Sequence, residues 1–175
     1  MLALTSPTSL AIRFCQHSDF SAIAHIYNES VALGDRTMDT HSYTVAEIAA
    51  MVKRFNDREC ILVAQQAEQI LGWGIIKRYS DRPGYHFCCE TSIYLCLGAT
   101  GNGYGTHLQR ALLSQVALFG YHHIVVKILA ANTGSIRFHQ RFGFEMVGIQ
   151  TEIGYLNGCW HDVVILQRLL PQDGE

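Results

Sequence analysis

Three glycines at alternate positions, Gly101, Gly103 and Gly105, mark the part of the sequence that is best suited to bind a ligand. The run of residues 100–106 lies between a β-rich segment and an amphipathic one, so we place it where a strand passes into a helix. Glycines there let the backbone bring successive N–H groups close to an anion, and the helix start adds partial positive charge. We therefore predict a binding site for a pyrophosphate, with a plain flexible turn as the alternative.

The same run does not match the two commonest nucleotide-binding loops. A Walker loop requires Gly-Lys-Ser/Thr, whereas Thr106 and His107 follow the last glycine here. The dinucleotide pattern GxGxxG fits poorly, because these glycines run as GxGxG in mid-chain, after a half of the sequence that reads as antiparallel.

Residue composition excludes several classes of partner. The 175 residues are 49% hydrophobic and 16% charged, and 13 basic against 15 acidic side chains give a net charge of −2. Such a chain is expected to form one globular domain, because it is too apolar to be disordered. It also lacks the basic excess that draws proteins to nucleic acid or to an anionic membrane. We expect its partners to be small molecules or a second copy of the chain.

Membrane spans, secretion signals and metal sites are not expected either. Every apolar stretch is interrupted before the roughly 18 residues that a transmembrane helix needs. Residues 1–10 contain no Lys or Arg, so they do not match a secretory signal, and we predict a cytoplasmic protein. The six cysteines show no CxxC spacing and are expected to be reduced, and we predict no bound metal.

Periodicity and capping residues predict the elements of the first half of the chain. Ser18 or Asp19 caps a first helix, and Thr44 with Glu47 forms a capping box for a second. The expected strands are residues 11–15, 60–65, 70–76 and 85–97.

The second half predicts a helix that connects two strands, followed by a hairpin. A helix containing Leu108 and Leu112 precedes the β-branched strand 124–129, and Asn132 caps a short helix that runs through Phe142. The final hairpin consists of strands 144–155 and 160–169 around the turn Asn157-Gly158.

Together these elements predict a mixed α/β domain whose antiparallel first half passes into a parallel crossover. We expect this single domain to span residues 11–170. Residues 1–10 are expected to be a flexible N-terminal tail, and residues 171–175 a C-terminal tail.

The motifs in these positions resemble the acetyl-CoA-binding core of the GNAT N-acetyltransferases over nearly the whole chain. The residues that carry the resemblance are Ile93-Tyr94-Leu95, Gly101-x-Gly103-x-Gly105 and Asn132-x-x-Ser135-x-x-x-His139-x-x-Phe142-Gly143-Phe144. The resemblance implies the GNAT fold, a central and mostly antiparallel sheet with a parallel crossover at the acetyl-CoA site and flanking helices.

Within that superfamily the sequence is most similar to the phosphinothricin and methionine sulfoximine acetyltransferases. Counterparts of their motifs are Ile26-Tyr27-Asn28, Gly72-Trp73, Arg82 followed by Tyr85, Glu90-Thr91-Ser92-Ile93-Tyr94 and Gly158-x-Trp160-x-Asp162. Two positions depart from the family pattern. Thr100 stands where the family usually has Arg or Gln, and Met38, before Asp39, stands where it has an aromatic residue.

The resemblance implies acetyl-CoA as the co-substrate and names the residues that would bind it. These residues are Ile93, Tyr94, Leu95, Gly101, Asn102, Gly103, Tyr104, Gly105, Thr106, Asn132 and Ser135. Ile93 and Leu95 would pair with the pantetheine arm through backbone groups, and Asn132 would both cap its helix and bond the arm.

Glu90 is the candidate general base that the resemblance implies. An amine attacks a thioester only when it is neutral, so a nearby base must accept its proton, directly or through one water. Glu90 lies in the strand that leads into the glycine-rich run, and partial burial in a strand can raise the pKa of a carboxylate. The alternative is a surface glutamate in a cross-strand pair.

His139 is the candidate proton donor to the leaving thiolate, at a position where many GNAT enzymes have Tyr. The alternative is a histidine on the helix surface or in the core. Cys96 lies near the same site, but the family habit is direct transfer, so we do not expect a covalent acyl-enzyme.

The acceptor implied by the resemblance is a small amino-acid-like amine such as phosphinothricin, methionine sulfoximine or methionine sulfone. Arg82 is expected to bind its carboxylate or phosphinate, with Tyr85 and Trp73 shaping the pocket and Met38 contributing to it. The family also implies a homodimer. Trp160, which the family shares, is expected to serve packing rather than catalysis, with a dimer interface as one place for it.

Other functions stay open at this point. A non-catalytic acyl-CoA-binding sensor is favoured by Thr100 and opposed by the presence of both Glu90 and His139. A GNAT enzyme that acts on a protein N-terminus or a polyamine is a further alternative. A polyamine site would need clustered acidic residues, whereas the region around Arg82 is basic.

Overall fold

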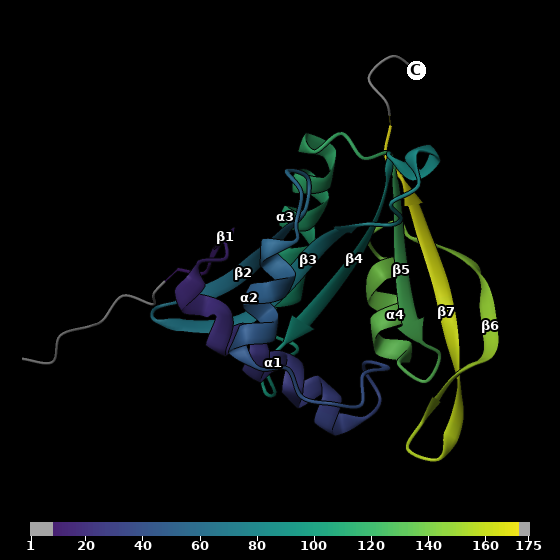
Figure 1. The fold of residues 1–175 in the computed structure, drawn as a ribbon, viewed down its shortest axis with the longest axis horizontal. Coiled ribbons are helices and arrows are strands. Elements are labelled where there is room, and N and C mark those ends of the chain that lie inside the picture. Colours follow the sequence, from purple (N-terminus) through teal and green to yellow (C-terminus); the bar gives the residue numbers. More distant parts are fainter. Residues whose placement is uncertain (1–8, 172–175) are drawn as a thin grey trace, which may run out of the picture.

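A computed structural model describes residues 9–171, which form a seven-stranded sheet in the order β1-β2-β3-β4-β5-β7-β6 (Figure 1). The strands are β1 Ala11–Phe14, β2 Cys60–Gln66, β3 Gln69–Arg78, β4 Cys88–Leu95, β5 His123–Leu129, β6 Glu145–Leu156 and β7 Cys159–Leu169. The helices of this part of the chain are α1 Phe20–Leu33, α2 Val45–Lys53, α3 Tyr104–Leu118 and α4 Thr133–Gln140, with short 3₁₀ turns at His17–Asp19 and Pro83–Tyr85.

Helices cover both faces of this sheet. Buried residues of α1 and α2 pack with Trp73 and Ile75 on one face. Buried residues of α3 and partly buried ones of α4 pack with Cys89 and Ile124 on the other. Because strand side chains alternate between faces, Glu90, Ser92 and Tyr94 of β4 belong to the face of α1.

The feature of the sheet that matters most for function is the short contact between β4 and β5. These two strands are parallel, as expected for a crossover through α3, and the other paired strands are antiparallel. The parallel pairing covers three residue pairs and ends at Glu90 with Val125. Beyond that pair the two strands separate, so residues 92–95 of β4 present an open backbone edge.

Local sequence signals account for most element boundaries. The Thr44–Glu47 capping box begins α2, and the side chain of Asn132 caps α4 by accepting a hydrogen bond from Ser135 N. Asn157 and Gly158 form the β6–β7 turn with φ of 51° and 80°. These predicted caps and this predicted turn are confirmed.

Two predicted boundaries were wrong. The strand expected over residues 85–97 begins only at Cys88, because Pro83 starts a 3₁₀ turn, and it ends at Leu95. The helix expected through Phe142 ends at Gln140, because Gly143 takes a left-handed φ of 77° that ends the helical path.

The sheet extends from Ala11 to Leu169, within the limits predicted for the domain. The predicted tails, residues 1–10 and 171–175, lie almost wholly outside the described residues. No helix within residues 9–171 is both long and apolar enough to cross a membrane.

Candidate active site

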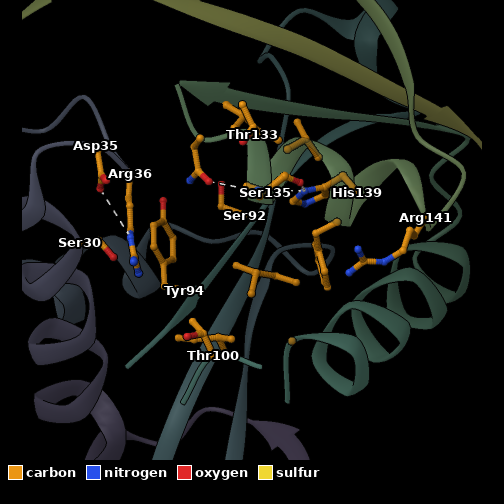
Figure 2. A pocket seen from close by; sticks show the side chains of 18 of the residues that line it. Ser30, Asp35, Arg36, Ser92, Tyr94, Thr100, Thr133, Ser135, His139 and Arg141 are labelled. Atoms are coloured by element: carbon orange, nitrogen blue, oxygen red, sulfur yellow. Dashed lines mark hydrogen bonds and ion pairs between the residues drawn. The ribbon is translucent and has the colours of Figure 1, made fainter. Parts of the chain in front are cut away.

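A cavity of about 650 Å³ lies where β4 and β5 separate (Figure 2). Its walls are the open edge of β4, the middle of β5, the starts of α3 and α4 and the loop between α1 and α2. The cavity therefore brings together segments from residue 30 to residue 141.

The glycine-rich run forms one end of the cavity. Gly101 and Gly103 have left-handed φ values of 84° and 83°, and Gly103 caps the start of α3. Gly105 lies below the ring of Phe138, which a Cβ at this glycine would approach to 3.6 Å. The strand-to-helix position of the run is as predicted, and the anion site, called the anion cradle below, stays a prediction.

Two residues of the run have side chains that bond elsewhere. The amide of Asn102 donates to the carbonyl oxygens of Ala99 and Thr100, each at 3.4 Å. The hydroxyl of Tyr104 donates to Gln66 Oε1 at 3.1 Å. Their contribution to an anion site is therefore limited to the backbone.

The other predicted cofactor residues border the cavity. Ile93, Tyr94 and Leu95 line it from the open edge of β4, and Asn132 and Ser135 line it from the start of α4. The site thus combines an anion cradle with an unpaired strand edge, which is suited to a ligand that has both a pyrophosphate and amide groups.

Glu90 forms an ion pair at the last paired position of β4 and β5. Lys127 Nζ donates to Glu90 Oε2 at 2.7 Å, and this ammonium also lies 5.5 Å from the centre of the Tyr79 ring. The side chain of Glu90 is 21% exposed. The cross-strand pair considered as the alternative is therefore present, and it is compatible with a base, because an ionised carboxylate is the form that accepts a proton.

His139 is a neutral histidine in the wall of the cavity. It is 4% exposed, and burial lowers its pKa below the ordinary value. Nδ1 lies 2.9 Å from the carbonyl oxygen of Ser135, so Nδ1 carries the proton and donates it. Nε2 is then an acceptor, and within residues 9–171 it has no hydrogen-bond partner. A proton donor needs a proton on Nε2, which burial disfavours.

An aromatic group supports Tyr94 from the face of α1. The centre of the Tyr94 ring lies 4.9 Å from that of Tyr27 and 4.6 Å from that of Trp73. The rings of Tyr27 and Trp73 are 5.9 Å apart. Burial raises the pKa of Tyr94 to about 12, so its hydroxyl stays protonated near neutral pH. Trp73 is 3% exposed and acts as packing behind the cavity wall.

The remaining predicted acceptor residues do not line this cavity. Arg82 and Tyr85 line a second cavity of about 360 Å³ together with Arg54 and Arg58. Met38 packs against β6, where a Cβ on Gly154 would lie 2.1 Å from its methyl carbon. Their role in binding the acceptor stays a prediction.

Several cavity residues were not singled out by sequence reasoning. They are Ser30, Asp35, Arg36, Lys127 and Arg141. Arg36 belongs to a polar loop with no periodicity, and Lys127 meets Glu90 only through strand pairing, so neither had a local signal. In the described part of the chain no three His, Cys, Asp or Glu side chains are grouped as metal ligands.

Comparison with known proteins gives consistent matches over most of the chain. Residues 12–165 match the family model described as acetyltransferase (GNAT) domain. Phosphinothricin N-acetyltransferase of Streptomyces coelicolor is 30% identical over 87% of this chain and 91% of its own length. L-methionine sulfoximine/L-methionine sulfone acetyltransferase of Pseudomonas aeruginosa is 30% identical over 91% of this chain and 94% of its own length.

A solved structure that contains AcCoA has the same fold. The phosphinothricin acetyltransferase of Sinorhizobium meliloti, determined with AcCoA, superposes with a TM-score of 0.87 at 28% identity and covers 94% of each chain.

Proposed function

This chain belongs to the GNAT acetyltransferases, and from that membership we propose that it acetylates the α-amine of a small amino-acid-like acceptor. The predicted family, fold, enzyme class and use of acetyl-CoA are confirmed. The proposed acceptors are phosphinothricin, methionine sulfoximine and methionine sulfone, the compounds named for the relatives. The observation that carries the proposal is the cavity that joins the anion cradle to the open edge of β4, with Glu90 two residues before Ser92 of its wall and paired with Lys127, which lines it.

The residues of the cavity fit acetyl-CoA. The backbone of residues 101–105 binds the pyrophosphate through N–H groups and the start of α3. The open edge at Ile93 and Leu95 hydrogen-bonds the amides of the pantetheine arm, as an added strand would. Asn132 borders the same arm from the start of α4. These contacts direct the thioester toward Ser92 and the last pair of the parallel ladder.

Glu90 accepts the proton of the attacking amine, directly or through one water. Glu90 takes this proton as the neutral amine attacks the thioester carbon: the C–N bond forms and the C–S bond breaks in a direct transfer, without a covalent enzyme intermediate. A backbone N–H of β4 in the stretch of Tyr94 and Leu95 donates to the developing oxyanion. The products are the N-acetylated acceptor and the thiolate of coenzyme A.

His139 has a different role in this proposal from the proton donor that the family comparison implied. Its buried ring is neutral, and its one proton is used in the bond to Ser135 O. Nε2 is therefore an acceptor, and within residues 9–171 it is buried and without a hydrogen-bond partner.

We also propose that the protein is a homodimer. Strand β6 is an edge of the sheet, and it and β7 expose many large apolar side chains, namely Met146, Val147, Ile149, Ile153, Tyr155, Trp160 and Leu169. A long apolar edge is normally covered by another chain. A cytoplasmic location stays our prediction from the sequence.

The test is release of free thiol from acetyl-CoA in the presence of single candidate acceptors. The panel contains methionine sulfoximine, phosphinothricin, methionine sulfone, ordinary amino acids, a polyamine and a short peptide. Acceleration by the first three compounds supports the proposal. If the peptide or the polyamine alone accelerated thiol release, the acceptor would be a protein N-terminus or a polyamine instead of an amino acid. No acceleration by any compound, with coenzyme A still bound in calorimetry, would favour the sensor alternative.

A further inference from the structure

The cavity contains three arginine or lysine side chains, and they differ in how they are engaged. Lys127 is paired with Glu90 at 2.7 Å. Arg141 lies beside the anion cradle, with its guanidinium 5.8 Å from the ring of Phe138 that covers Gly105. Arg36 lies at the opposite side of the cavity, beside Tyr94 (Figure 2). Its role is not explained by the transfer reaction described above.

The backbone around Arg36 is firmly held. Gly34 ends α1 in the left-handed conformation, with φ of 68°. On the other side the hydroxyl of Tyr27 donates to the carboxylate of Asp39 and lies 2.9 Å from Thr37 Oγ1. A side chain that is carried by such a fixed segment has a defined direction before any ligand binds.

The guanidinium of Arg36 contributes little to the stability of the fold. Within residues 9–171 its ion pair is with its neighbour Asp35, at 3.6 Å from Nε to Oδ1. Asp35 is 64% exposed, so water screens this pair strongly. The Arg36 side chain itself is 36% exposed and borders the cavity, which leaves its planar donor set free for a ligand.

Arg36 lies on the side of the sheet from which the acceptor must approach Glu90. It follows α1, whose Tyr27 packs against Tyr94, and Glu90, Ser92 and Tyr94 share that face. Arg36 thus provides a guanidinium in the cavity, and Glu90, two residues before Ser92 of its wall, provides a carboxylate on the same face of the sheet. An α-amino acid has a matching pair of groups, an amine and a carboxylate on one carbon.

We propose that Arg36 binds the α-carboxylate of the acceptor and so selects amino acids over simple amines. This inference rests on the proposed acetyl transfer. A guanidinium can donate two parallel hydrogen bonds to a carboxylate, and a neutral amide in place of the carboxylate forfeits both their charge and their geometry. The inference assigns to Arg36 the role that the sequence predicted for Arg82, which lines the other cavity.

The experiment compares the best acceptor of the panel with its α-carboxamide, which keeps the amine and the side chain but lacks the charge. For the wild type we expect kcat/KM to favour the acid over the amide. In Arg36→Gln we expect that preference to fall by about tenfold or more, through a higher KM for the acid. KM for acetyl-CoA and the thermal midpoint should stay near the wild-type values.

Arg82→Gln tests the rival position, because it removes the same charge from the second cavity, where the sequence predicted this role. It should keep the preference for the acid. Loss of the preference in Arg82→Gln, or its retention in Arg36→Gln, would overturn the inference. A raised KM for acetyl-CoA in Arg36→Gln would also overturn it, because the arginine would then bind the donor.

Calorimetric titration of the acid and the amide into the protein saturated with coenzyme A keeps the two proposals distinguishable. Tighter binding of the acid that is lost in Arg36→Gln supports the carboxylate contact even if no panel compound is acetylated. Equal binding of acid and amide by the wild type would overturn the contact, whatever the outcome of the activity panel.

Discussion

At the scale of single residues, the proposed base Glu90 is a carboxylate held by the ammonium of Lys127. Lys127 fixes Glu90 at the point where the parallel ladder ends, and it leaves the other carboxylate oxygen free to accept a proton. The fixed position of the base should therefore matter for the chemical step more than for binding of the donor.

We expect Glu90→Gln to lower kcat by roughly 10²- to 10⁴-fold, the range for loss of a positioned general base. KM for acetyl-CoA and the dissociation constant of coenzyme A should change little, because Gln keeps the size and the hydrogen-bond acceptor. Steady-state kinetics and calorimetry measure these quantities, and Glu68→Gln in the β2–β3 turn is the control. If coenzyme A no longer bound to Glu90→Gln, the residue would have a structural role instead.

Residue types and spacing were enough to pick out the glycine-rich run and the helix cap at Asn132, which have a glycine spacing and a capping position as local signals. Glu90 and His139 were predicted from the resemblance to the GNAT family, and their roles stay predictions. Arg36 and Lys127 have no local signal, because their roles depend on which loop and which strand lie next to β4. The likeness to known families implied a proton donor at position 139, whereas the burial that opposes this role is a property of the folded chain.

The neutral state of His139 predicts a pH dependence of stability. Its pKa is lowered in the folded protein, so the unfolded chain binds the proton more readily below the ordinary histidine pKa, about 6.5. The contribution is fully present above that pH and is lost as the pH falls toward the folded pKa. His139→Asn keeps a donor for Ser135 O but cannot titrate.

We therefore expect thermal midpoints to fall less between pH 7.5 and pH 5.5 in His139→Asn than in the wild type. His107→Asn on the exposed face of α3 is the control, since its midpoints should fall as those of the wild type do. Equal falls in all three proteins would contradict the buried neutral ring.

Arg141 is expected to bind a phosphate of acetyl-CoA. The glycine-rich run contains no cationic side chain, and Thr100 begins it, whereas Arg141 lies beside it over Phe138. Arg141→Gln should weaken binding of coenzyme A about tenfold in calorimetry and lower its salt dependence. Arg137→Gln, one turn earlier on α4 and exposed, should bind as the wild type does. If Arg141→Gln and Arg137→Gln bound coenzyme A with equal affinity, Arg141 would not bind a phosphate of the donor.

At the scale of elements, capping and turn residues defined most helices and hairpins correctly, and the errors lay in loops with proline or glycine. The close approach of β3 and β4 was not visible from periodicity. Gly72 pairs with Leu95, and a Cβ there would lie 2.7 Å from the carbonyl oxygen of Tyr94 and 2.5 Å from Leu95 Cδ2. Gly72 therefore sets the position of the strand edge that receives the donor.

Gly72→Ala should displace that edge. We expect a loss of about 1–3 kcal/mol of stability from overpacking, together with a raised KM for acetyl-CoA. Denaturant unfolding and steady-state kinetics measure the two effects. Gly84→Ala is the control, because a Cβ there has no neighbour within 4 Å among the described residues and its φ is not left-handed. A normal KM in Gly72→Ala would show that the edge tolerates the shift.

At the scale of the whole molecule, β6 and β7 form an exposed apolar edge of the sheet. Trp160 is 61% exposed and stacks edge-on against Tyr155 at 4.9 Å. This surface cannot be recognised from sequence patterning, because apolar strand residues are equally expected in a core. Its exposure is a property of the assembled sheet.

Trp160→Glu should convert the proposed dimer into a monomer, because a charge at the centre of an apolar interface is costly to bury. Light scattering after size exclusion measures the mass. Leu118→Glu is the control, since Leu118 is 80% exposed on α3 and lies outside this surface. A wild-type monomer, or a dimer that persists in Trp160→Glu, would exclude this interface.

The early end of the β4–β5 ladder also bears on the stability of this enzyme. In the proposed complex the donor would make hydrogen bonds that residues 92–95 leave open, so it would stabilise the folded chain. At a concentration 100 times its dissociation constant, such a ligand adds about 2.7 kcal/mol to the free energy of unfolding. The fraction of molecules exposed to proteases would then fall when acetyl-CoA is plentiful and rise when it is scarce. The abundance of the enzyme would follow the supply of its own donor without any regulatory domain.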